Sequence, residues 1–203
     1  MPTDSIEPRF LLSLLVGFTT TAFSIVCLLA QIVRKDLNAL HVPLTLYLNG
    51  YLGRLVRAAY YLMAGGLLAI SWAIAALGLA GQWSWVTSGL FVISAASLPV
   101  LVFTRPRPGH VFSKQALYFH RGSTYFTFVN LIAGMSIVSC EHAAAAGAYA
   151  VWGLALSVLA MIGLFLSIFA RSLPHGLVQK ALILVIILWL YWAAFHVLGG
   201  AGL

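Results

Sequence analysis

The sequence at residues 10–35, FLLSLLVGFTTTAFSIVCLLAQIVRK, is an apolar run that ends in two cations. A helix that crosses the hydrocarbon core of a bilayer needs about 20 mainly apolar residues, and this run has that length. It is too long for the apolar core of a signal peptide, it follows Asp4 and Glu7, and Arg34 and Lys35 act as a stop-transfer pair. The run therefore predicts a transmembrane helix.

Five further apolar runs follow, joined by short loops. The chain is 62% hydrophobic and 7% charged, whereas soluble domains are about 25% charged. Backbone polar groups within a bilayer are satisfied inside helices. We therefore predict an all-α polytopic membrane protein with one domain over residues 1–203. Its bundle of six transmembrane helices is expected at residues 10–33, 55–80, 83–103, 123–139, 147–170 and 178–198.

The cations are distributed unevenly among the loops. Of the 11 Lys and Arg residues, all except Arg9 lie in or beside the first, third and fifth loops. By the positive-inside rule these loops are cytoplasmic and both termini lie outside. We expect the chain in a bacterial cytoplasmic (inner) membrane. Its formal net charge of +7 then favours anionic headgroups of membrane lipids on the cytoplasmic side as partners, and not nucleic acid.

Polar and small residues recur at steps of three and four along two of the predicted helices. Such stripes face other helices or a ligand cavity, whereas Leu131 is expected to face lipid. We predict that the stripe of the fourth helix faces the first or second helix. If the bundle holds a ligand, the intramembrane polar contacts are expected to be Asn130, Thr127 and Ser24. The stripes comprise Ser13, Gly17, Thr20, Ser24, Cys27 and Gln31, and then His120, Ser123, Thr127, Asn130 and Gly134.

The first loop has the largest concentration of polar residues, and Pro43 is placed to open a re-entrant or interfacial helix there. Other cations share its side of the membrane, and arginine binds phosphate or carboxylate through a planar fork. We predict an anion or lipid-headgroup site formed by these residues: Arg54, Arg57, Arg121 and Lys180, with Tyr51 and His120 at its edge. The alternative is that these cations only set topology and contact headgroups.

The histidine and tryptophan residues near the predicted outer side of the membrane are not part of this anion site. Trp189 and Trp192 are expected to anchor at the membrane interface. A haem b would require two imidazoles at matching depth, and His142 and His196 are the best candidate pair for that alternative. No Cys/His spacing typical of zinc is present, and no nucleophile or nucleotide motif is found. We therefore predict no metal ligand and no catalytic residue, and we expect no cofactor.

Several short patterns resemble the uncharacterised six-helix membrane family called domain of unknown function number 998. Pro43, Thr45, Tyr47, Gly50 and Gly53 carry the first pattern, which opens the second helix. The second pattern is a histidine, His120, at the start of the fourth helix. The third is Gly176-Leu177-Val178-Gln179-Lys180, which leads into a last helix that contains Trp189. The resemblance implies the six-helix fold and assigns no activity.

Function is expected to be non-enzymatic: a lipid-contacting binding protein or an accessory subunit that associates with other membrane subunits. The main alternative is a small-molecule transporter or a haem- or quinone-binding membrane protein, and a membrane enzyme is the third. Carboxylates are few, and none lies inside a predicted span, which disfavours a proton- or cation-coupled pump.

Overall fold

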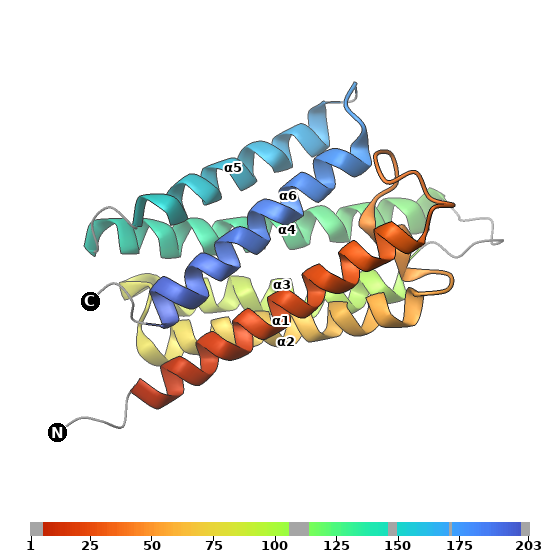
Figure 1. Ribbon diagram of the computed structural model, residues 1–203. Coiled ribbons are helices and arrows are strands. Elements are labelled where there is room, and N and C mark those ends of the chain that lie inside the picture. The colour runs from red at the N-terminus through yellow and green to blue at the C-terminus, as the bar shows by residue number, and fades with distance from the viewer. Residues whose placement is uncertain (1–5, 106–113, 146–149, 171, 200–203) are drawn as a thin grey trace.

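The computed structural model describes residues 6–105, 114–145, 150–170 and 172–199. Figure 1 shows its long helices running side by side. All six are long and apolar enough to cross a membrane, which confirms the predicted bundle. The helices are α1 (Ile6–Val33), α2 (Gly53–Leu77), α3 (Ser84–Phe103), α4 (Lys114–Ala145), α5 (Ala150–Phe169) and α6 (His175–Trp192). Short helical turns are η1 (Leu44–Leu48), η2 (Gly81–Trp83) and η4 (Ala193–Leu198).

The helices form a closed ring. Each helix packs on the next one in the chain, and α6 with η4 packs on α1. Successive helices are antiparallel, so α1, α3 and α5 end where α2, α4 and α6 begin (Figure 1). We call this the basic end, because it carries the described cations apart from Arg9, and we call the other end the far end.

Several helix boundaries differ from those predicted, and the differences in α4 and α2 have identifiable causes. Helix α4 has 32 residues, whereas the apolar run predicted only residues 123–139. Its extra turns contain polar residues, which lower hydropathy without preventing helical hydrogen bonds. Helix α2 stops before the predicted residue 80 because Gly78 adopts a left-handed conformation with φ of 64° and its N–H bonds Ile74 O. A glycine in this conformation is a common C-terminal stop signal.

Large apolar side chains cover the outside of the ring. Phe18 is 63% exposed, Phe169 is 70% exposed and Trp85 is 80% exposed. Water-soluble monomers rarely expose contiguous apolar surface of this extent, whereas lipid covers it in a bilayer. Together with the six apolar helices, this surface identifies an integral membrane protein.

The predicted tryptophan anchors are wrong. Trp189 is fully buried and Trp192 is 6% exposed, because α6 turns this face toward α4 and α5. The exposed tryptophans lie elsewhere in the far half of the bundle, where they suit the membrane interface. They are Trp72, Trp83, Trp85 and Trp152.

The polar stripe of α4 is buried, but its partner is not the predicted one. Thr127 Oγ1 donates to Ser97 Oγ of α3 at 2.7 Å. A methyl group on Gly134 would lie 2.8 Å from Phe91 Cε2, also on α3. The prediction that this stripe packs on the first or second helix is therefore wrong, because α4 lies beside α3 in the ring. Leu131, predicted to face lipid, is only 5% exposed.

Candidate functional site

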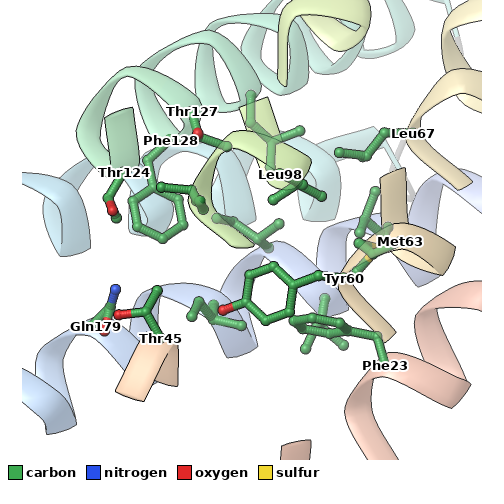
Figure 2. A pocket seen from close by; sticks show the side chains of 16 residues that line it. Phe23, Thr45, Tyr60, Met63, Leu67, Leu98, Thr124, Thr127, Phe128 and Gln179 are labelled. Atoms are coloured by element: carbon green, nitrogen blue, oxygen red, sulfur yellow. The ribbon is translucent and has the colours of Figure 1, made fainter. Parts of the chain in front are cut away.

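The centre of the ring contains a narrow apolar cavity, which we call the inner cavity (Figure 2). Its volume is about 60 Å³, which is enough for a few water molecules, since each needs about 10–15 Å³. Thr45, Thr124 and Gln179 lie on one side of the cavity, and the Tyr60 hydroxyl points toward Thr45 (Figure 2). The apolar walls come from α1, α2, α3, α4 and α6, and they include Phe23, Met63, Leu67, Leu98, Phe128 and Ile187.

A second, wider cavity of about 420 Å³ lies at the basic end. We call it the vestibule. It lies between the turn η1, the first half of α4, the last turns of α5 and the start of α6. Its polar lining residues are His41, Thr45, His120, Arg121, Thr124, Tyr125, Ser167, His175 and Gln179.

The two cavities are adjacent. Thr45, Thr124, Phe128 and Gln179 line both of them. A polar space and an apolar space therefore lie on either side of a shared wall. Volumes of this kind, apolar with a few placed polar groups, are typical of small-molecule sites.

The first loop forms one wall of the vestibule because it is bonded to the start of α6. Leu177 N donates to Leu40 O at 2.8 Å, and Leu44 N donates to Gln179 Oε1 at 3.2 Å. Close approach requires glycine at position 176, where a methyl group would lie 2.6 Å from Val42 O. A short helix does follow Pro43, as the 3₁₀ turn η1, and its predicted re-entrant or interfacial position stays a prediction.

The other side of this loop is held by cations. Arg34 Nη1 donates to Asn49 O at 2.5 Å, and the same guanidinium pairs with Asp36 at 2.7 Å. The Arg34 hydrogen bonds hold the pKa of the Asp36 carboxyl below its usual value. Arg105, which follows α3, donates from Nε to Asn49 Oδ1 at 3.2 Å. The loop is therefore tied to residues just after α1 and α3 and to α6, and burial raises the pKa of its Tyr47 phenol.

His120 is oriented by the residue that follows the end of α3. The single hydroxyl proton of Thr104 is directed to Val100 O at 2.8 Å, so Thr104 Oγ1 accepts from His120 Nδ1–H at 3.2 Å. With Nδ1 protonated, a neutral imidazole presents Nε2 as a hydrogen-bond acceptor. His120 lines the vestibule, although only 6% of the residue is exposed.

The residues of the predicted anion site do not all lie around one cavity. His120 and Arg121 line the vestibule. Lys180 bonds Ala39 O instead, and its Nζ lies 5.3 Å from the centroid of the Tyr47 ring. Among the described residues, Tyr51, Arg54 and Arg57 are not part of either cavity wall; Tyr51 is 86% exposed.

The predicted intramembrane polar residues have different positions. Thr127 lines the inner cavity. Asn130 Nδ2 donates to Phe126 O at 2.7 Å and Ser24 Oγ donates to Thr20 O at 2.7 Å, both within their own helices. Neither side chain belongs to the described walls of the two cavities.

The candidate haem pair lies at the far end. Both imidazoles pack against one indole: the Trp192 ring centroid is 5.9 Å from that of His142 and 6.3 Å from that of His196. Neither histidine lines the inner cavity or the vestibule as described. Within the described residues no group of three or more His, Cys, Asp and Glu side chains could hold a metal ion.

Sequence reasoning missed the role of Gln179, Thr124 and His175 in the walls of the vestibule. Gln179 is 5% exposed although it is polar. The available signal was a glutamine one turn inside an apolar helix, where an unpaired amide is costly. Thr124 and His175 gave no comparable signal, because their positions depend on how α4 and α6 are placed in the ring.

Comparisons with family models, with curated proteins and with solved structures found no match for this chain. The candidate site therefore rests on the geometry described above.

Proposed function

We propose that this integral membrane protein is a non-enzymatic binding protein for an amphiphilic molecule of the bilayer. The polar head of the ligand lies in the vestibule, and its apolar part lies in the inner cavity. One observation supports this most directly: four residues line both cavities, so the polar space and the apolar space lie directly beside each other.

The arrangement of polar groups supports the same interpretation. Thr45, Thr124 and Gln179 also line the vestibule, and most of the other walls of the inner cavity are leucine, isoleucine, methionine and aromatic rings. The apolar chain of a bilayer lipid therefore keeps apolar surroundings when it moves from the membrane into the inner cavity. A polar solute would lose its hydration in the inner cavity without finding enough partners.

We further propose that the basic end faces the cytoplasm, because anionic lipid there attracts cations. The vestibule then draws its ligand from the cytoplasmic leaflet. Fusion of a periplasmic reporter such as alkaline phosphatase to the C-terminus is expected to be active in a bacterial host. Activity of a cytoplasmic reporter at the same position would contradict this orientation.

Blocking the inner cavity tests the binding function. Leu98→Phe adds volume in the cavity, whereas Val92→Phe changes the same helix at a position that is 43% exposed on the lipid side. The wild type and Val92→Phe are expected to retain copurifying amphiphile in native mass spectrometry after mild detergent extraction. Leu98→Phe is expected to lose most of it. Equal retention by the two variants would contradict the proposed function.

A further inference from the structure

The chemistry of the vestibule indicates which kind of head group it holds. We propose that the ligand is a single-chain acid, with a carboxylate or a phosphate monoester as its head. This inference rests on the proposed function, because it names the ligand class of the same site. Three observations carry it: the charge of the vestibule walls, the unused donors of Gln179, and the tautomer of His120.

The walls of the vestibule contain basic groups and no carboxylate among the described residues. Its ionisable residues are Arg121, the three histidines His41, His120 and His175, and the phenol of Tyr125. In addition, α6 begins at His175, and the N-terminus of a helix carries a partial positive charge. An anionic head is attracted by these groups, whereas an ammonium head is repelled by Arg121.

Gln179 supplies donors for such a head. Leu44 N–H donates to its side-chain oxygen, which fixes the other end of the amide as nitrogen. No described residue accepts a hydrogen bond from that nitrogen, although Gln179 is 5% exposed. Figure 2 shows this nitrogen beside the inner cavity, on the side of Thr124. An oxygen of a bound acid would accept a hydrogen bond from it.

His120 complements an acid in both of its protonation states. As a neutral ring, its Nε2 accepts the O–H of a carboxylic acid or of a phosphate monoester in its monoanionic form. If the proton moves from that oxygen to Nε2, the imidazolium donates back to the resulting anion. The hydrogen bond to Thr104 Oγ1 keeps Nδ1 protonated in both states.

The inner cavity limits the apolar part to one chain. A volume of about 60 Å³ corresponds to a few water positions. This space is too small for a sterol ring system or a macrocycle, so we infer that it takes part of one unbranched chain. A lipid with two chains would have to leave one of them outside the ring.

Binding of matched amphiphiles tests this inference. Delipidated protein is titrated with myristic acid, myristyl phosphate, myristyl alcohol and myristylamine, which share one chain and differ in the head. Acetate and inorganic phosphate serve as acids without a chain. Both myristyl acids are expected to bind at least about tenfold tighter than the alcohol, because hydrogen bonds to charged groups are the stronger ones. The amine is expected to bind more weakly still.

Matched variants locate the effect. Arg121→Gln is expected to remove most of the preference for acids, and Arg54→Gln, at the same end but outside the described cavity walls, is expected to leave it unchanged. Arg121 is exposed, so its loss is not expected to unfold the protein. If Arg121→Gln nevertheless unfolds, Arg121→Lys is used and should keep a reduced preference.

The failures are distinguishable. If the alcohol binds as tightly as the acids and Leu98→Phe abolishes both, the amphiphile site stands and the acidic head is wrong. If inorganic phosphate binds as tightly as myristyl phosphate, the site is for a soluble anion and this inference is overturned. If no amphiphile binds better to the wild type than to Leu98→Phe, the proposed function itself fails.

Discussion

The two ends of the bundle contain similar residue types and use them differently. At the far end, Trp189 Nε1 donates to Ser139 Oγ at 2.9 Å, and Trp192 packs on the two histidines. At the basic end, histidines line a cavity of about 420 Å³. At the far end, large aromatic side chains fill the centre of the ring. At the basic end, the first loop forms one wall of a cavity that no side chain fills. Histidines in a membrane helix therefore indicate a ligand site only where the surrounding packing leaves space.

The largest effect is expected from overfilling the far end. A methyl group at Gly153 would lie 2.6 Å from Trp192 Cζ2, and the indole is buried and cannot move freely. Gly153→Ala should therefore lower stability by about 1–3 kcal/mol, measured as earlier thermal unfolding in detergent. Gly65→Ala is the control, because its added methyl meets nothing within 4 Å. Equal melting temperatures for the two variants would contradict a tightly packed far end.

A somewhat smaller effect is expected at the wall of the vestibule. Gln179→Met removes the acceptor of Leu44 N–H while keeping side-chain length. A buried unsatisfied N–H costs about 1–3 kcal/mol, and partial access to water in the vestibule places the expected loss near the lower limit. The same change at exposed Gln115 should have no effect on the melting temperature. Faster proteolysis at residues 37–50 in Gln179→Met alone would localise the loss to the loop.

Filling the hollow region should change stability little. Leu98→Phe places extra carbon atoms in free space, so the expected change in unfolding free energy is below about 1 kcal/mol. The comparison with Gly153→Ala is direct, because both changes add volume inside the ring. A strong destabilisation by Leu98→Phe would mean that the inner cavity is not available to a ligand chain.

The smallest effect is expected at the exposed edge of the loop. Because the folded-state pKa of Asp36 is lowered by Arg34, the ion pair adds stability above the unfolded pKa of Asp, and this contribution is lost as the pH falls through the folded pKa. The difference in melting temperature between the wild type and Asp36→Asn should be small at neutral pH and vanish in acid. A difference that grows in acid would have the wrong sign.

The cations of the basic end show which parts of the candidate site could be predicted from the sequence. The sequence placed Arg54, Arg57, Arg121 and Lys180 at one side of the membrane, because counting the cations in each loop is enough for that prediction. It could not predict that Lys180 bonds Ala39 O or that the described vestibule walls include Arg121 without Arg54 and Arg57. Those differences depend on which face each helix turns toward the centre of the ring.

The sequence by itself determined the solvent, the number of spans and the sidedness of charge, because hydropathy and charge are summed over whole segments and tolerate local errors. It also predicted the turn after Pro43. Only the tertiary structure decided that Trp189 is buried, that Leu131 faces inward and that Gln179 lines two cavities. All helices here are apolar on most of their circumference, so periodicity alone cannot tell lipid from a protein interior. Contact between helices distant in sequence supplies that distinction.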